Sequence, residues 1–214
     1  MKVNWKEGQS EHTVTSPMTL NISSFSNVND LNKSVTPELS NSDTTLLHLW
    51  AHSDKYRLGG SALYQSFKLY GGATPDIDDA NQFKVLFEAT QELLDKDFIE
   101  ALHDISDGGL ITSLIEMALC SNQGLDINLD YSDKEQLVPK LFSEEIGLVI
   151  EVKNEKLESV RNYLNEKELF FENIAKKNDK KKININCFKE EVFSEDLITL
   201  FNQWSKVSLS LIHI

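Results

Sequence analysis

Carboxylates, a serine and two glycines lie close together in the segment 100–120, which reads EALHDISDGGLITSLIEMALC. In chain order they are Asp104, Ser106, Asp107, Gly108 and Gly109. Carboxylates suit Mg²⁺, which proteins bind through one or two of them together with substrate phosphates. A serine can donate to a phosphate oxygen, and glycines let the amides at a helix start approach a ligand. The loop could therefore hold nucleotide phosphates through Mg²⁺. Alternatively, Asp107 caps the following helix and the glycines only make a turn; spacing alone leaves both interpretations open.

A second glycine pair precedes a serine in the segment 57–65, RLGGSALYQ, which contains Gly59, Gly60 and Ser61. Free amides at a helix start can bind an anion. The Gly-Lys-Ser/Thr sequence of a P-loop does not follow, however. A glycine turn with Ser61 as the helix N-cap is the plainer interpretation.

Two acidic clusters have simpler explanations than a metal site. Asp76, Asp78 and Asp79 lack the spacing and closing glutamate of a calcium loop, and acids are favourable at a helix start. Glu144 and Glu145 directly precede an apolar run. We interpret this pair as part of a solvated turn rather than the wall of a cleft.

Two basic features are also open to more than one interpretation. His103 adjoins Asp104 and could act as a general acid or base near neutral pH, but a hydrogen-bonded structural histidine is the commoner case. The lysine-rich segment 176–184 favours a solvated hairpin tip or strand-entry loop over an anion-binding patch, because the rest of the chain is acidic.

The elements that must position these residues alternate between strands and helices, which indicates an α/β layer architecture. The apolar run TTLLHLW at 44–50 predicts a buried strand. Met18, Leu20 and Ile22 alternate as in a half-buried strand. Further strands are predicted at 125–129, 147–152 and 181–188.

Helices are predicted by apolar residues at helical spacing. They lie at 61–72, closed by Gly71 and Gly72, at 78–97, after Gly109, at 155–167 and near the end around Leu197 and Trp204. The helix at 78–97 is predicted to bury one face, formed by Phe83, Leu86, Phe87, Thr90 and Leu94.

The composition narrows the classes of partner. The 214 residues include 34 acidic and 21 basic side chains, a formal charge of −13, which argues against nucleic acid and anionic membranes. No apolar run approaches the ~18 residues of a membrane helix, and no signal peptide opens the chain. Cys120 and Cys187 form neither a disulfide framework nor a thiolate metal site. We expect a cytoplasmic protein that acts on small molecules.

Several stretches together carry a resemblance to a known family. MKVNWKEG, VTSPMTLNISSF, TPELS, LGGSALYQ, PDIDDANQFKVLFEATQELL, HDISDGGLITSLIEMALC and LFSEEIGLVIEV occur in this order. They resemble the C-terminal part of the synthase half of phosphoribosylformylglycinamidine synthase in its large single-chain form, over about residues 1–208. The wider superfamily includes aminoimidazole ribonucleotide synthetase, selenophosphate synthetase and thiamine-monophosphate kinase.

The resemblance implies a fold and a division of the chain. The fold is a layered sheet with flanking helices, similar to the C-terminal domain of aminoimidazole ribonucleotide synthetase. This domain would occupy 43–208, after a remnant of the preceding N-terminal-like domain and a connector at 1–42. The tail at 209–214, LSLIHI, does not fit the family pattern. The chain would then be a fragment, inactive alone, whose partners are the missing synthase half and glutaminase domain of the same polypeptide.

The resemblance also implies an activity and site residues. The family is an ATP-dependent ligase of purine biosynthesis that converts formylglycinamide ribonucleotide and glutamine to the amidine, with ADP and phosphate as further products. Asp104 would bind Mg²⁺ and Ser106 would contact the nucleotide; Gly59, Gly60 and Ser61 could line a phosphate pocket. Alternatively, the nucleotide site is structural rather than catalytic, or the chain belongs to a related member of the superfamily.

Overall fold

The computed structural model describes residues 2–15, 22–28, 30–51, 55–129, 134–188 and 190–211. The chain divides into two compact units, Met1–Asn32 and Lys33–Ile214. In the first unit, β1 (Lys2–Glu7) and β2 (Ser10–Thr15) form an antiparallel hairpin. Of the strand predicted from Met18, Leu20 and Ile22, the first two residues lie outside the described residues, and Ile22 is exposed and irregular.

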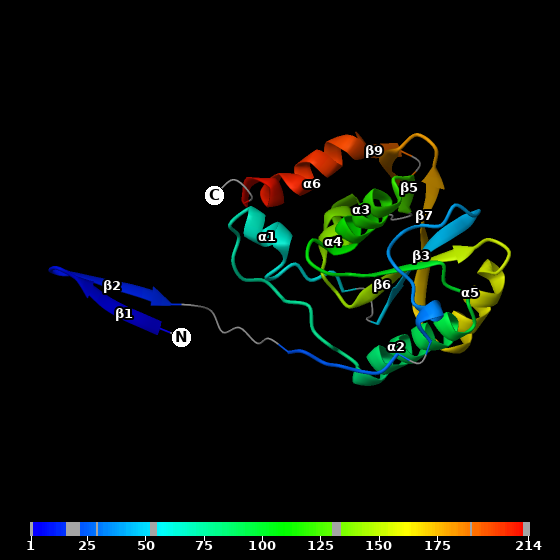
Figure 1. The fold of residues 1–214 in the computed structure, drawn as a ribbon, viewed down its shortest axis with the longest axis horizontal. Coiled ribbons are helices and arrows are strands. Elements are labelled where there is room, and N and C mark those ends of the chain that lie inside the picture. The colour runs from blue at the N-terminus through cyan, green and yellow to red at the C-terminus, as the bar shows by residue number, and fades with distance from the viewer. Residues whose placement is uncertain are drawn as a thin grey trace. The chain divides into compact units, whose positions relative to one another are not determined.

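The second unit is built on a mixed seven-stranded sheet in its described part (Figure 1). Its strands are β3 (Thr44–Trp50), β4 (Ala101–Asp104), β5 (Gly124–Leu129), β6 (Gly147–Lys153), β7 (Phe170–Asn178), β8 (Lys182–Cys187) and β9 (Glu190–Asp196). Their order is β4-β6-β3-β7-β5-β8-β9, in which β5 and β8 are parallel and the other neighbours antiparallel. All seven residues of β3 are buried, as the apolar run predicts.

Helices cover both faces of this sheet (Figure 1). They are α1 (Ala62–Ser66), α2 (Ala80–Asp95), α3 (Gly109–Ser121), α4 (Leu137–Phe142), α5 (Leu157–Glu166) and α6 (Leu197–Leu211), with 3₁₀ turns at Leu31–Lys33 and Lys134–Gln136. One apolar cluster packs α3, α4 and α6 against the sheet, and a second packs α2 and α5 against the other face. Leu46 belongs to the first cluster and its neighbour Leu47 to the second, as the alternation of a strand requires. The predicted α/β layer fold is confirmed.

The helix predicted at 61–72 is much shorter than expected. It ends after Ser66 because Lys68 adopts a left-handed backbone (φ 55°) and the amide of Leu69 donates to the carbonyl of Tyr64 (2.8 Å). Gly71 and Gly72 therefore lie in the loop beyond the helix and do not close it.

The buried face of α2 also differs from the prediction. The helix buries Leu86, Ala89, Thr90 and Leu93, whereas Phe87 is 59% exposed. Phe83 is also exposed, so the buried stripe is rotated away from the two phenylalanines.

The connection from β7 to β8 passes over the start of another strand. β5 lies between β7 and β8 in the sheet, so the turn at 179–181 crosses its first residue, Gly124. A Cβ at Gly124 would lie 2.7 Å from the backbone of Lys182, and only glycine leaves room for this crossing. The lysine-rich segment 176–184 contains this turn, but it is neither a hairpin tip nor a loop throughout: residues 176–178 end β7 and residues 182–184 begin β8.

A fully buried carboxylate ties the start of the second unit to the sheet. Glu151 of β6 accepts hydrogen bonds from the Ser40 amide (2.8 Å) and the Thr44 hydroxyl (2.7 Å), and it pairs with the Lys177 ammonium (2.7 Å). Leu39, in the segment that the sequence marks as a connector, is buried beside this network.

Within the described residues, no helix has the length and apolar character needed to cross a bilayer.

Replacing Glu151 by alanine should strip this buried network of its acceptor and leave the Lys177 charge uncompensated. We expect a loss of about 3–5 kcal/mol in the free energy of unfolding, measured by urea denaturation. The exposed pair of Lys84 and Glu88 provides the control, because Glu88→Ala should change stability by less than about 0.5 kcal/mol. Equal effects of the two substitutions would contradict a structural role for Glu151.

Candidate functional site

Asp104 lies at the end of β4, where the strand passes into the glycine loop. Its side chain is 70% exposed, and Ser106 and Asp107 are also exposed. Gly108 has a left-handed backbone (φ 89°) and is the N-cap of α3 without a side-chain cap bond. Asp107 therefore does not cap this helix, and the plain capping interpretation of the loop is wrong.

The backbone of Asp104 is held firmly although its carboxylate is open. Its carbonyl accepts the Ser113 hydroxyl (2.8 Å) and faces Nδ1 of His103 (2.7 Å). The next residue, Ile105, donates its amide to the carbonyl of Gly147 on β6 (2.9 Å). The loop thus presents an accessible oxygen ligand from an ordered backbone, which suits the binding of one hard cation.

Gly109 lets the start of α3 pack directly on α4. A Cβ there would lie 2.7 Å from the carbonyl oxygen of Ser143 and from the carbonyl carbon of Phe142, and Gly109 itself has φ 74°. The glycine pair is therefore needed for close approach as well as for the turn.

The second glycine loop uses its serine internally. Ser61 is fully buried, donates from Oγ to the carbonyl of Leu58 (2.7 Å) and accepts the Tyr64 amide (3.3 Å) as the N-cap of α1. The Gly59 amide donates to the carbonyl of Ala73 (2.8 Å), and Gly60 takes a left-handed backbone.

Glu144 joins the two glycine loops. Its Oε1 atom accepts the amide of Ala62, at the start of α1 (2.7 Å), and the amide of Gly108, before α3 (2.9 Å). One carboxylate oxygen thus serves two helix starts that are 46 residues apart in the chain, where negative charge is favourable. The two predicted loops are therefore neighbours, and a phosphate at Ala62 would compete with Glu144.

Glu145, beside it, is buried rather than solvated. Its side chain is 4% exposed and accepts hydrogen bonds from Nε of Arg57 (2.6 Å) and from a second guanidinium nitrogen (2.7 Å). The hydrogen bond and charge of Glu145 raise the pKa of Arg57 above its ordinary value although burial opposes this. The prediction of a solvated turn at Glu144 and Glu145 is wrong, because both carboxylates have partners far away in the sequence.

The last residue of the acidic cluster before α2, Asp79, stabilises the start of this helix, as predicted. Asp79 caps α2 by accepting the amides of Asn81 (2.8 Å) and Gln82 (3.2 Å). Asp78 pairs instead with Lys55 (2.8 Å) and Arg57 (3.0 Å). The hydrogen bond from Lys55 and the charge of Arg57 lower the pKa of Asp78.

A second buried ionic group lies near the Ser143–Glu145 segment and has no obvious signal in the sequence. Lys140 of α4 is fully buried, 2.7 Å from Glu172 of β7 and over the ring of Trp50 (4.4 Å to its centroid). His48 contacts the same Glu172 oxygen (3.2 Å). Burial alone would raise the pKa of Glu172, but the His48 hydrogen bond and the Lys140 charge hold it below its usual value.

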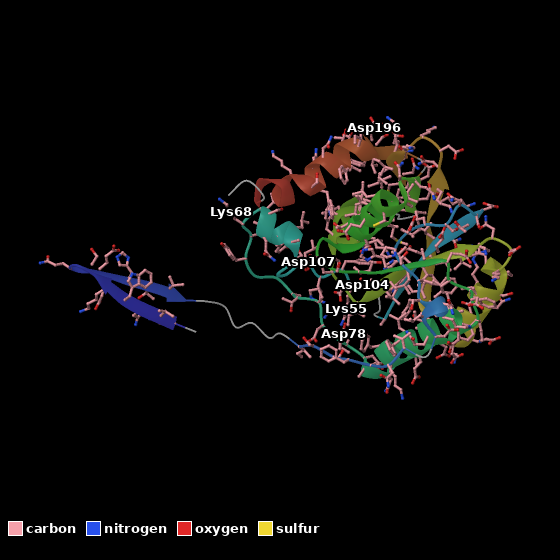
Figure 2. The ribbon with its side chains drawn as sticks, viewed as in Figure 1. Lys55, Lys68, Asp78, Asp104, Asp107 and Asp196 are labelled. Carbon is pink, nitrogen blue, oxygen red and sulfur yellow. The ribbon has the colours of Figure 1, made fainter. Side chains whose placement is uncertain are left out.

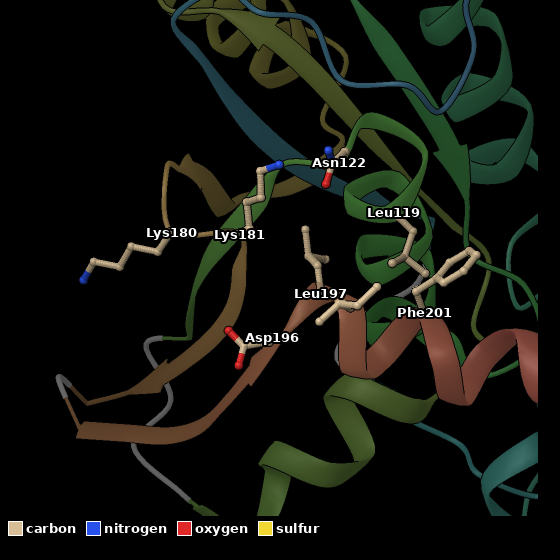
Figure 3. A pocket seen from close by; sticks show the side chains of 8 residues that line it. Leu119, Asn122, Lys180, Lys181, Asp196, Leu197 and Phe201 are labelled. Atoms are coloured by element: carbon tan, nitrogen blue, oxygen red, sulfur yellow. The ribbon is translucent and has the colours of Figure 1, made fainter.

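Figure 2 labels Asp104 and Asp107 well apart from Asp196. Asp196 borders a surface hollow of about 390 Å³ at the far end of α3 (Figure 3). The hollow is lined by Leu119, Asn122, Lys180, Lys181, Asp196, Leu197, Ile198 and Phe201.

Among the residues that the structure describes, no group of three or more His, Cys, Asp or Glu side chains could enclose a metal ion. Any metal held by Asp104 would take further ligands from a substrate or another part of the protein.

The fold and this loop define an α/β domain whose sheet presents an open aspartate beside a glycine turn. Residues 50–187 match the family described as AIR synthase related protein, C-terminal domain. The chain belongs to this family.

Solved structures share the fold at low identity. PurL of Thermotoga maritima complexed with ATP is 15% identical with a TM-score of 0.64, over 79% of this chain and 27% of that one. PurL of the same organism complexed with FGAR is 18% identical with a TM-score of 0.66, over 79% and 30%. HypE of E. coli, a hydrogenase maturation protein, is 19% identical with a TM-score of 0.52, over 77% and 52%. The chain thus spans less than a third of the length of these PurL chains.

Removal of the Glu144 carboxylate should loosen both glycine loops. Glu144→Ala leaves the amides of Ala62 and Gly108 without their acceptor, so we expect a loss of about 1–3 kcal/mol in unfolding free energy and faster hydrogen exchange at both amides. Glu144→Gln keeps an acceptor oxygen of the same reach and should lose clearly less. If the glutamine variant were as damaged as the alanine variant, the shared acceptor would not be what joins the loops.

Gly109 is needed both for its close approach to α4 and for its left-handed backbone, and the two effects on stability can be measured separately. Gly109→Ala adds both left-handed strain, about 1–3 kcal/mol, and overlap with the α4 backbone, about 1–3 kcal/mol more. Gly71 is the matched control, since it has φ 89° but nothing within 4 Å of a new Cβ. Urea denaturation should show the larger loss at Gly109, and equal losses would refute the packing argument.

Proposed function

We propose that this chain is the C-terminal part of the synthase half of a large, single-chain phosphoribosylformylglycinamidine synthase. The observation that carries the proposal is the open Asp104 carboxylate on a fixed backbone, in a chain of the AIR synthase related family. The ordered motifs from VTSPMTLNISSF to LFSEEIGLVIEV support this member over others. The domain would cover 43–208 after a remnant and connector at 1–42, with 209–214 outside the family pattern.

The reaction assigned to such an enzyme joins ammonia from glutamine to formylglycinamide ribonucleotide with consumption of ATP, in the cytoplasm. The Mg²⁺ and nucleotide supply charge neutralisation and the phosphoryl group when bound. In this chain, Asp104 would supply one oxygen ligand to Mg²⁺, and the Ser106 hydroxyl would donate to the nucleotide. An exposed carboxylate with a weak His103 contact (3.3 Å) fits a cation that keeps several waters or phosphate oxygens.

Gly59, Gly60 and Ser61 would line a phosphate pocket in this proposal. The Ser61 hydroxyl is buried in its cap, and the amides of Gly59 and Ser61 donate to the carbonyls of Ala73 (2.8 Å) and Leu58 (3.2 Å). An anion here would have to displace one of these bonds or use the amide of Gly60. An anion at the start of α1 would also have to displace Glu144 from the amide of Ala62. The remaining contacts to substrate would come from the missing synthase half and the glutaminase domain.

The substitution Asp104→Asn tests the proposal and separates a catalytic from a structural nucleotide site. In the full-length protein we expect loss of ATP-dependent amidine formation, by at least about a hundredfold, with an unchanged melting temperature without ligand. Turnover is measured as ADP release that depends on formylglycinamide ribonucleotide. Asp107→Asn, on the same loop, is the control and should retain activity.

Other results would point elsewhere. Full turnover in Asp104→Asn, together with a lost thermal shift on adding Mg²⁺ and ADP, would support a structural nucleotide instead. Normal turnover and a normal thermal shift would exclude Asp104 from any nucleotide site.

A further inference from the structure

His103 lies between the candidate metal ligand and a glutamate of α3. Its Nδ1 atom is 2.7 Å from the carbonyl oxygen of Asp104 and 3.3 Å from the Asp104 carboxylate. Its Nε2 atom is 3.1 Å from Oε2 of Glu116. The His103 side chain is only 13% exposed, so its ring is held on both sides.

The second oxygen of Glu116 extends this chain of contacts to the last helix. Oε1 of Glu116 accepts the indole N–H of Trp204 on α6 (3.1 Å). α6 packs along α3, as Figure 3 shows where Phe201 lies beside Leu119, and Leu200 packs against the core. A contact series therefore runs from α6 through α3 to the end of β4.

We propose that Trp204, Glu116 and His103 form a positioning relay for Asp104. This inference depends on the proposed function, because it gives a purpose to the orientation of the Asp104 carboxylate. His103 and Ser113 both bind the Asp104 carbonyl and so fix the peptide from which the carboxylate projects. Glu116 fixes the ring of His103, and Trp204 fixes Glu116. Outer partners of this kind orient a ligand without touching the cation.

The relay can be tested by substitution at His103, because the side-chain amides of asparagine and glutamine each take the place of one ring nitrogen. The amide nitrogen of Asn reaches about as far as Nδ1, and that of Gln about as far as Nε2. His103→Asn can keep the contact to the Asp104 carbonyl, whereas His103→Gln can keep only the contact to Glu116. A merely structural histidine would not require that asparagine be the better replacement.

The test is the affinity of the full-length protein for Mn²⁺ in the presence of ADP, measured by electron paramagnetic resonance. His103→Ala and His103→Gln should weaken binding about 10- to 100-fold, and His103→Asn should stay within about threefold of the unaltered protein. Trp204→Phe keeps the ring but loses the N–H, so we expect a weakening of about two- to tenfold. Ile198→Ala, at an exposed position on the same helix, should leave the affinity unchanged.

The outcomes separate the relay from the function on which it depends. If Asp104→Asn abolishes Mn²⁺ binding while the His103 and Trp204 variants bind normally, the relay is wrong and the proposed function stands. If His103→Ala, His103→Asn and His103→Gln weaken binding equally, His103 is only structural and the relay is again wrong. Where His103→Ala fails to fold, Trp204→Phe decides. No Mn²⁺ binding by the unaltered protein, or none lost in Asp104→Asn, would contradict the proposed function itself.

Discussion

One carboxylate oxygen of Glu144 determines how the candidate site is assembled. It accepts the amide that starts α1 and the amide that precedes α3, so two loops from separate parts of the chain share one anion. Helix starts attract negative charge because their first amides have no partner within the helix. The next residue, Glu145, pairs with Arg57 and so attaches the loop at 57–61 to the segment that precedes β6. Without this internal anion the two loops would share no acceptor, and their attachment would depend on contacts such as the Arg57–Glu145 pair.

The sheet decides where Asp104 is presented. β4 is an edge strand, paired only with β6 in the described sheet, and the pairing of Asp104 with Leu148 is the last of the ladder. The chain then leaves the ladder, with the Ile105 amide bonded to the carbonyl of Gly147, and passes into α3. The apolar face of α3 is buried against the sheet. The aspartate thus combines a rigid backbone with an open side chain. This combination fits the proposed role of Asp104 as a ligand shared with a bound nucleotide.

Local patterns in the sequence predicted the parts of the structure that depend on local interactions. The largely apolar run of seven residues from Thr44 identified β3, and the spacing after Gly109 identified α3. The roles of Glu144 and Glu145 were missed because their partners lie 36 to 88 residues away, and no short pattern marks them. The face of α2 was misjudged because large apolar residues do not by themselves show which side meets the sheet. The metal and nucleotide roles of Asp104 and Ser106 came from the family resemblance and remain proposals.

The crossing of β5 by the turn between β7 and β8 constrains the order in which the sheet can form. Two consecutive strands joined by three residues would ordinarily pair first, as a local hairpin. Here they cannot pair with each other, because β5, drawn from about fifty residues earlier, occupies the place between them. The strands β7 and β8 are joined within one sheet only when that distant segment is inserted between them. The strands β8 and β9 can still pair with each other locally, but they join β7 only through β5. Assembly of this half of the domain therefore depends on a long loop closure as well as on a local turn.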